Sequence, residues 1–332
     1  MRRGARVESV HAVAAAAVDP RGTLALALGS IDLPIWLRST AKPLIAAEIV
    51  RSGAADGYGF DERELAVICA SHGGEPGHVA AVQSVLRKIG LDEAALQCGV
   101  QPPAHASSAD ALAARGEAPS ALHNNCSGKH AGILALALHL GSDPAGYLAP
   151  EHPAQRAILA TCARLCGLPT EEIPLAVDGC GIPVIAVALR SAALAFARLA
   201  TLEGIAGGDA RALERVRTAV AHEPWYLAGT GRFDSALAGA SGGRIVGKGG
   251  AEGVHGDALI REGLGLALKV VDGARRAVPP ATLALLRRLG ALDSGERDAL
   301  APFERVLVRN VAGRVVGVLE ALVPETEARP PA

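Results

Sequence analysis

The chain has 332 residues, a net charge of −1 and no basic block, so nucleic acids and membrane surfaces are not expected as partners. Half of its residues are apolar and only 3% are aromatic, which supports one large or two small domains with cores of Ala, Leu, Val and Ile. Arg190 and Arg198 interrupt the most apolar stretch, 184–200, and this excludes a membrane span there.

Two strands, 6–18 and 23–29, are predicted at the start of the chain, joined by the turn Asp19–Gly22. The first residues, with a basic start and an alanine run, are similar in composition to a signal peptide. Because the apolar pattern resumes after the turn, we expect a hairpin instead, in a cytoplasmic protein. A helix follows from Pro43 to about Arg51, because proline is tolerated in a first turn whose N–H groups have no partners to lose.

Ser39 and Lys42 stand three residues apart at the start of this helix. On a helix they share a face, so the hydroxyl can meet the ammonium group. A lysine whose pKa is lowered by burial or by positive neighbours can take a proton from a serine, and Ser-x-x-Lys is found in acyl-transfer enzymes. A capping serine followed by a solvated lysine would show the same spacing.

The middle of the chain is predicted to be mostly helical. Asp61 is placed to cap one helix, and Gly167 ends another. A short helix is predicted to begin at residue 62. Further helices are predicted over 78–89, 109–115, 131–140, 153–166, 184–200 and 210–221.

Strand signals return toward the end of the chain. They cover 244–248, 306–310 and 314–323, whereas 280–289 indicates a helix and 264–272 fits either a strand or a buried helix. Strands at both ends with helices between them predict an α/β fold, with a mainly antiparallel sheet built from both termini and flanked by helices.

We therefore expect one unit over 1–332, in which a mostly helical region is inserted into the sheet-containing part. The sheet-containing part is assigned to 1–59 and 225–325, and the mainly helical part to 60–224. Only the tail from 325 has the composition of a frayed terminus.

Lysine is rare in this chain, since only five of its 33 basic residues are Lys. Three of the five, Lys42, Lys129 and Lys248, stand in glycine-rich or hydroxyl-rich segments. Arginine stays charged, whereas lysine can act as a base. Lys248 follows a strand signal and is flanked by glycines that would let a substrate approach, although an exposed hairpin would look similar.

Ser71 and His72 end an apolar run and precede Gly73 and Gly74. Glycines allow a ligand to approach the backbone closely and leave N–H groups free to bind an oxyanion. A glycine-rich turn with a capping serine is the plainer interpretation of this segment on its own.

Six cysteines at irregular spacing indicate reduced thiols. Cys126 lies just before a predicted helix with Lys129 and His130, and Cys180 lies in a second glycine-rich turn. Thiolate and imidazole groups favour zinc, but the spacing is not that of a known finger. Buried structural cysteines are the alternative.

Taken together, several segments resemble the L-asparaginase II family, the Rhizobium etli-type (class 3) asparaginases. The resemblance covers residues from about 6 to 323, in the family's order. It implies a fold similar to serine β-lactamases, penicillin-binding proteins and glutaminases. The matching segments are 38–43, 69–72, 123–130, 151–153, 178–183 and 247–250.

The resemblance implies two Ser–Lys pairs, Ser39 with Lys42 and Ser71 with Lys248, acting on L-asparagine. It also implies a homodimer and a zinc site. The zinc ligands that the resemblance assigns are Cys126, Lys129 and Cys180. The substrate-binding residues that it assigns are Arg38, His72, Asp178 and His130.

Three other functions stay open at this point. Another serine amidohydrolase could act on glutamine or on a β-lactam. A zinc hydrolase could use the metal to generate hydroxide. A non-catalytic ligand-binding protein could keep the fold, although it would have no need for two bases.

Overall fold

The central element is a five-stranded antiparallel sheet, seen in a computed structural model that describes residues 1–323. Its strand order is β4-β3-β10-β9-β8. Two strands come from the start of the chain and three from its last third: β3 (Val13–Val18), β4 (Leu24–Leu28), β8 (Ile245–Gly249), β9 (Val254–Leu259) and β10 (Leu264–Val270). The predicted α/β fold with a sheet built from both termini is confirmed, and the ambiguous segment 264–272 forms a strand as far as Val270. The tail predicted from 325 lies outside the described residues.

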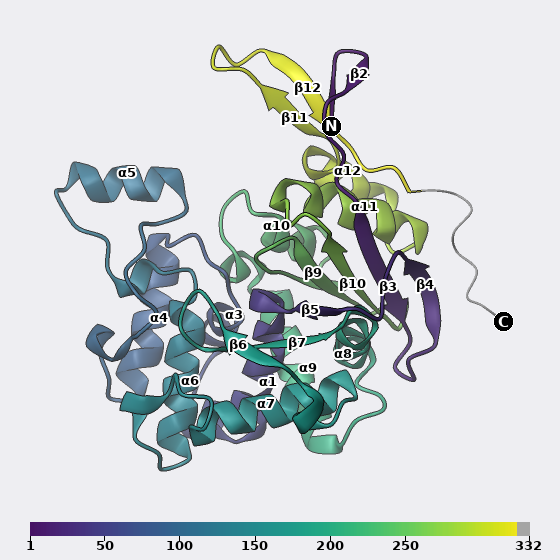
Figure 1. The fold of residues 1–332 in the computed structure, drawn as a ribbon. Coiled ribbons are helices and arrows are strands. Elements are labelled where there is room, and N and C mark those ends of the chain that lie inside the picture. Colours follow the sequence, from purple (N-terminus) through teal and green to yellow (C-terminus); the bar gives the residue numbers. More distant parts are fainter. Residues whose placement is uncertain (324–332) are drawn as a thin grey trace.

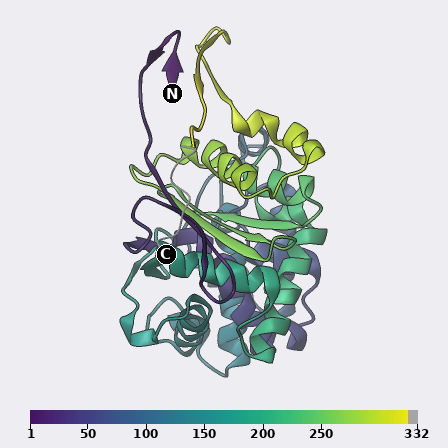
Figure 2. The same ribbon diagram turned by 90° about the vertical axis from the view of Figure 1, so that its right-hand side faces the viewer.

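Helices cover both faces of this sheet (Figures 1 and 2). On one face α8 (Leu189–Thr201) packs closely, because two strand positions are glycines. A Cβ at Gly265 would lie 2.0 Å from the carbonyl oxygen of Ala193. The other face is covered by α10 (Phe233–Ala240), α11 (Val278–Arg288) and α12 (Ser294–Glu304), whose apolar side chains form a second core cluster.

The ends of the chain form a separate four-stranded sheet, in the order β11-β12-β1-β2, which projects from the body as an arm (Figure 1). Its strands are β1 (Arg2–Arg3), β2 (Arg6–Val7), β11 (Val306–Arg309) and β12 (Val315–Leu319). The single strand predicted over 6–18 is therefore wrong. The chain leaves the arm after Val7 and enters the central sheet at Val13.

A third sheet has the order β5-β7-β6. Its strands are β5 (Pro34–Trp36), β6 (Leu175–Val177) and β7 (Pro183–Ala188). The helix predicted over 184–200 is wrong in its first part, since α8 begins only at Leu189. Val184, Ile185 and Val187 favour extended backbone, and Val187 pairs with Ile35 of β5.

The inserted region is a helical layer around α1, which packs against α6, α7 and α9. Its helices are α1 (Lys42–Arg51), α2 (Ala54–Gly57), α3 (Glu62–Ile68), α4 (Pro76–Lys88), α5 (Ala106–Ala114), α6 (Ser127–His139), α7 (Pro153–Cys166) and α9 (Gly207–His222). Asp61 caps α3 through a capping box with Glu64, and Gly167 ends α7 with φ 71°, as predicted. In the part of the chain that is described, no helix has the length and apolarity that a membrane crossing requires.

Candidate active site

A cavity of about 450 Å³ opens where the inserted helices meet the central sheet, and it holds three of the predicted catalytic residues. Ser39, Ser71 and Lys248 all line it, together with Asn125 of the turn before α6. Lys42 lies behind the wall. Residues separated by more than 200 positions in the sequence are therefore brought to one hollow, as the family resemblance implied.

Lys42 is fully buried at the start of α1, and its ammonium contacts Ser71. Its Nζ donates to Ser71 Oγ at 3.0 Å and to the backbone carbonyls of Ala70 and, at 3.3 Å, Asn125. No carboxylate among residues 1–323 pairs with it. Burial, assisted by the charges of nearby lysines, lowers the pKa of Lys42 to about 8.

Ser39 lies on a 3-10 turn, Arg38–Ala41, directly before α1. Its side chain is half-buried and its Oγ makes no hydrogen bond within the described residues. The expected contact between Ser39 and Lys42 is thus replaced by one between Lys42 and Ser71, because Lys42 extends toward the segment between α3 and α4. Arg38 has φ 51°, an uncommon conformation for a residue other than glycine, and such strain clusters at functional sites.

The backbone N–H groups at the cavity wall that have no partner in the described chain include those of Ser39 and Ala251. The N–H of Ser71, by contrast, donates to the carbonyl of Leu227 at 3.0 Å. Free N–H groups beside a nucleophile can stabilise an oxyanion. Ser39 therefore has such a donor in its own backbone, and Ser71 does not.

Lys248 is also fully buried, but it has a carboxylate partner. Its Nζ lies 3.0 Å from Asp234 Oδ2 and donates to the carbonyl of Gly249 at 2.6 Å. Burial would raise the pKa of the Asp234 carboxyl, but the charges of Lys248 and His255 outweigh it and lower that pKa to about 2. No hydrogen bond joins Lys248 to Ser71, the partner that the resemblance assigned to it, although both line the cavity.

A second buried pair lies behind Asp234 and was not predicted. His255 Nε2 is 2.9 Å from Asp257 Oδ1, and His255 Nδ1 is 3.9 Å from Asp234 Oδ1. The pKa of His255 is raised, because Asp257 outweighs the effect of burial. Strand β9 places both side chains on one face, opposite Gly249 and Gly247 of β8.

The glycines of β8 make room for this network. A Cβ at Gly247 would lie 2.4 Å from Asp257 Oδ1. The sequence does contain a signal for it, since Val254-His-Gly-Asp-Ala-Leu259 alternates polar and small or apolar residues in a strand-like run. Asp234, in contrast, lies on a helix with no distinguishing neighbours.

His72, predicted to bind substrate, is buried and does not line the cavity. Its Nε2 lies 2.9 Å from Ser127 Oγ, and its Nδ1 accepts from the N–H of Gly74 at 3.1 Å. Burial lowers its pKa well below the usual range. In this arrangement His72 is a neutral side chain that fixes the segment carrying Ser71.

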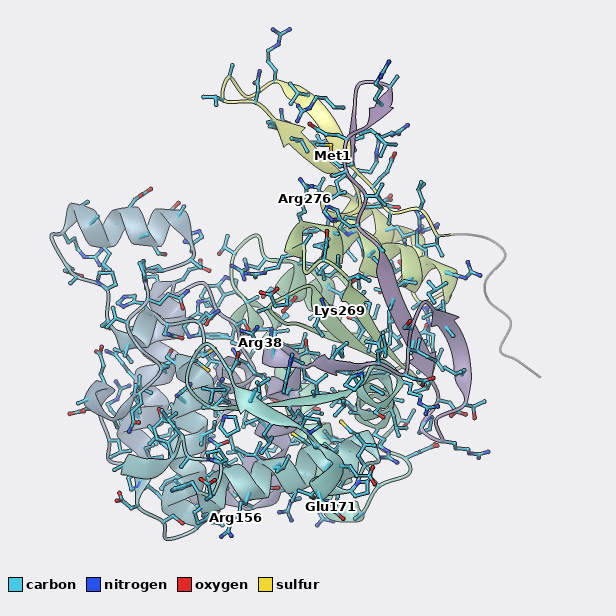
Figure 3. The ribbon with its side chains drawn as sticks, viewed as in Figure 1. Met1, Arg38, Arg156, Glu171, Lys269 and Arg276 are labelled. Atoms are coloured by element: carbon cyan, nitrogen blue, oxygen red, sulfur yellow. The ribbon has the colours of Figure 1, made fainter. Side chains whose placement is uncertain are left out.

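Arg38 and Asp178, also predicted to bind substrate, form an ion pair, with 2.6 Å between Nε and Oδ1. They border a second, small cavity of about 30 Å³ on the other side of Lys42. Arg38 lies near the middle of the molecule in Figure 3. Burial raises the pKa of Asp178, but Lys129 and Arg38 outweigh it, and the net shift is downward.

The predicted metal residues lie together. Cys126 precedes α6, Lys129 lies in its first turn, and Lys129 Nζ donates to Cys180 Sγ at 2.9 Å. A hydrogen bond with Cys180 and the nearby Lys129 charge hold the pKa of the Cys126 thiol well below its usual range. His130 Nδ1 lies 2.7 Å from Tyr147 Oη, and its buried Nε2 has no hydrogen-bond partner among the described residues.

Within residues 1–323, no group of three or more His, Cys, Asp or Glu side chains is placed to hold a metal ion. A metal bound by the two thiols would therefore need Lys129 as a third protein ligand. The two buried sulfurs are ligands that zinc accepts, and Lys129 beside them would have to lose a proton to offer its amine.

The sequence profile of the L-asparaginase II family matches residues 1–321, so the chain belongs to that family. It is an asparaginase-type amidohydrolase. The search of curated proteins found no match to this chain.

Solved structures that resemble the chain include a β-lactamase from Mycobacterium bovis, with 13% identity and a TM-score of 0.45. That match covers 84% of this chain and 95% of the other. Two structures of Mglu, one in its native form in 4.3 M NaCl, show 18% identity and a TM-score of 0.37. They match 85% of this chain, which spans 62% and 68% of their own lengths.

Proposed function

We propose that this protein hydrolyses the side-chain amide of L-asparagine to give L-aspartate and ammonia, with Ser39 as the nucleophile. The observation that supports this best is the fully buried Lys42, which contacts Ser71 at 3.0 Å and has no carboxylate partner among residues 1–323. Both serines line the same cavity, so Lys42 can act as a base there through the Ser71 hydroxyl.

The contacts of Lys42 support a proton path that runs through Ser71. A neutral amine has two N–H donors and one lone pair, and two of its three contacts, Ala70 and Asn125, are carbonyl acceptors. The lone pair is therefore left for the Ser71 hydroxyl. In this proposal the bound substrate brings the Ser39 hydroxyl to Ser71, and Ser71 then passes its proton to Lys42 and receives the proton of Ser39.

Ser39 Oγ, deprotonated in this way, forms a bond to the amide carbon of the substrate. The N–H groups of Ser39 and Ala251, which are free donors at the cavity wall, would stabilise the resulting oxyanion. The C–N bond then breaks as Lys42 returns the proton through Ser71 to the leaving ammonia. Water hydrolyses the Ser39 ester by the same route, which releases aspartate and restores the serine.

Lys248 has a different part in this proposal. Its contacts with Asp234 and Gly249 hold it as a fixed cation at the cavity wall. A fixed charge in a water-poor site stabilises negative charge that develops during the reaction. Lys248 therefore acts on the oxyanion and the substrate carboxylate, and proton transfer is left to Lys42.

We also propose that Cys126, Lys129 and Cys180 hold a zinc ion. Bound there, zinc would fix the turn before α6 and add positive charge behind Lys42, which would favour its neutral form. Because thiolates and a neutral amine are the binding forms, metal uptake would release protons.

The direct test is ammonia release from L-asparagine and L-glutamine by the purified protein, with and without a chelator. We expect release from asparagine, a preference over glutamine, and its loss in Ser39→Ala. Activity that survives in both Ser39→Ala and Ser71→Ala would refute the serine mechanism. A zinc hydrolase would instead lose its turnover with the chelator and keep it in both serine variants.

The homodimer implied by the family resemblance remains a proposal. The terminal arm is the part of the described surface that suits it, because it exposes the apolar side chains of Val7, Leu307, Val311 and Val315. Sedimentation of the full chain would measure the mass, and a monomer at micromolar concentration would contradict the proposal.

A further inference from the structure

Ser71 lies in an irregular segment, 70–75, that joins α3 to α4. Its hydroxyl meets Lys42 Nζ at 3.0 Å, and Lys42 also donates to the carbonyls of Ala70 and Asn125. The position of the segment therefore decides whether this contact exists. A displacement of about 1 Å would break the hydrogen bond between the two side chains.

A second irregular segment, 228–232, runs beside the first and leads into α10. It contains two glycines with positive φ, Gly229 at 108° and Gly231 at 68°. Leu227, directly before it, accepts the N–H of Ser71 at 3.0 Å. Because neither segment belongs to a sheet or a helix, this backbone contact depends on what holds the two segments together.

Glu75 supplies such a link from the end of the first segment. Its side chain is buried, and both of its oxygens bind Thr230 in the second segment. Oε1 accepts the backbone N–H of Thr230 at 2.9 Å, and Oε2 accepts its hydroxyl at 2.7 Å. His105 Nδ1 lies 3.7 Å from Oε2, beyond hydrogen-bond range. A Cβ at Gly229 would lie 2.2 Å from Oε1, so only glycine lets the carboxylate approach this closely.

Stacked rings support the same junction. His78 of α4 stacks on Trp225, with 4.1 Å between ring centroids, and on His72, with 5.1 Å. Trp225 Nε1 donates to Thr230 Oγ1 at 3.1 Å. Thr230 is thus the residue at which the ring stack and the Glu75 carboxylate meet. The rings fill the space behind the two segments, and the two hydrogen bonds of Glu75 fix their relative position.

We infer that Glu75 is a positioning residue, whose carboxylate binds Thr230 and thereby holds the Ser71 hydroxyl within hydrogen-bond distance of Lys42. This rests on the proposed function, in which Ser71 relays the proton between Ser39 and Lys42. Glu75 does not line the cavity, so it acts through the backbone that carries Ser71 and not on the substrate.

The test compares kcat and KM for ammonia release from L-asparagine in three variants. Glu75→Ala should lower kcat about 10²-fold and leave KM nearly unchanged, because a displacement of about 1 Å in a reacting group can cost that much. Glu75→Gln should keep most of kcat, since the amide can accept the N–H of Thr230 and donate to its hydroxyl. Thr230→Val should lower kcat about tenfold, and should have no further effect when it is combined with Glu75→Ala.

Glu296 of α12 provides the matched control. It is also a buried glutamate that accepts a backbone N–H, that of Asp293 at 2.8 Å, but it lies outside the cavity wall and both segments. Glu296→Ala should lower the urea midpoint as Glu75→Ala does, with kcat unchanged. An unchanged kcat in Glu75→Ala, or equal losses of kcat in Glu75→Gln and Glu75→Ala, would overturn the inference. So would an equal loss in Glu296→Ala.

Hydrogen exchange gives a measurement that does not need turnover. In a peptide covering 69–75, the Ser71 amide should exchange faster in Glu75→Ala and in Thr230→Val, but not in Glu75→Gln or Glu296→Ala. Thr230→Val, a nearly isosteric change, serves the same comparison if Glu75→Ala does not fold. If the unmodified protein releases no ammonia while this exchange pattern holds, the proposed reaction fails and the hold on Ser71 stands. If asparagine is hydrolysed and neither exchange nor kcat responds to these variants, only the positioning role fails.

Discussion

The surroundings of Lys42 and Lys248 show how one residue type can be given two chemistries at a single site. Both side chains are fully buried. Lys42 contacts a hydroxyl and two carbonyls, and the acidic groups that act on it are the thiols of Cys126 and Cys180. Lys248 contacts the carboxylate of Asp234, with His255 and Asp257 behind it.

The difference teaches that burial alone does not decide what a lysine does. An amine without an anionic partner becomes easier to deprotonate when it is buried, and it can serve as a base. An amine that pairs with a buried carboxylate remains a cation, and its removal leaves an uncompensated charge. Changes around Lys42 are therefore expected to affect mainly the rate, and changes around Lys248 mainly the stability.

The largest effect is expected from removing the nucleophile on the Lys42 side. Ser39→Ala should lower kcat by at least about 10⁴-fold, and Ser71→Ala and Lys42→Met by about 10²–10⁴-fold, because they interrupt only the proton path. Steady-state ammonia release measures all three. A diazoketone analogue of asparagine should attach to the peptide containing residue 39, and attachment at 71 would exchange the roles of the two serines.

The next effect concerns the ion pair of Lys248. Lys248→Met and Asp234→Leu should each lower the free energy of unfolding by about 3–5 kcal/mol, since each leaves a buried charge without its partner. Urea unfolding measures this. The double variant should recover most of the loss, and losses that simply add would show that the two side chains are not coupled.

The third prediction concerns stabilisation by zinc through the thiols near Lys42. At free zinc about 100-fold above its Kd, binding should stabilise the protein by about 2.7 kcal/mol. This stabilisation should disappear in Cys126→Ala and Cys180→Ala. Cys166→Ala is the matched control, because that thiol is buried on α7 and belongs to neither lysine's surroundings. Thermal unfolding with and without a chelator would show the difference, and an equal zinc response in all three variants would exclude the proposed ligands.

The smallest effect is on the pH dependence of the rate. Lys42 must lose its proton to act, and its pKa of about 8 implies a neutral fraction of about one tenth at pH 7 and one half at pH 8. The value of kcat/KM should therefore rise about fivefold between these two pH values. Asp234, with a pKa of about 2, stays ionised throughout and adds no second step. A flat profile from pH 6 to 9 would contradict the role of Lys42.

The sequence predicted the residues around the cavity better than it predicted their partners. Ser39, Ser71 and Lys248 were placed in one site by a family resemblance, and the cavity holds all three. Their contacts could not be predicted, because the spacing of Ser39 and Lys42 gives no information on where a long flexible side chain extends. Only the segment 70–71 and Asn125, brought in by tertiary packing, determine that.

The fold was predictable where the sequence pattern has one meaning. The helix ending at Gly167 and the capped start at Asp61 were located from local chemistry. The segment 183–188 was not, since a short apolar run fits a buried strand as well as a buried helix. Its partner β5 lies about 150 residues earlier in the chain, and pairing over that distance leaves no local signal.

The antiparallel pairing of β3 with β10 also has a consequence for biosynthesis. Ala16 of β3 pairs with Ala267 of β10, so β3 cannot complete its pairing until about 250 more residues have been synthesised. At a ribosomal rate of about 5–20 residues per second, this delay lasts about 10–50 s. Until then the hairpin of β3 and β4 exposes an alanine-rich edge that can pair with another chain. The nascent chain is therefore most exposed to aggregation while the helical layer is being made, and a chaperone that covers its first 30 residues would raise the yield of folded protein.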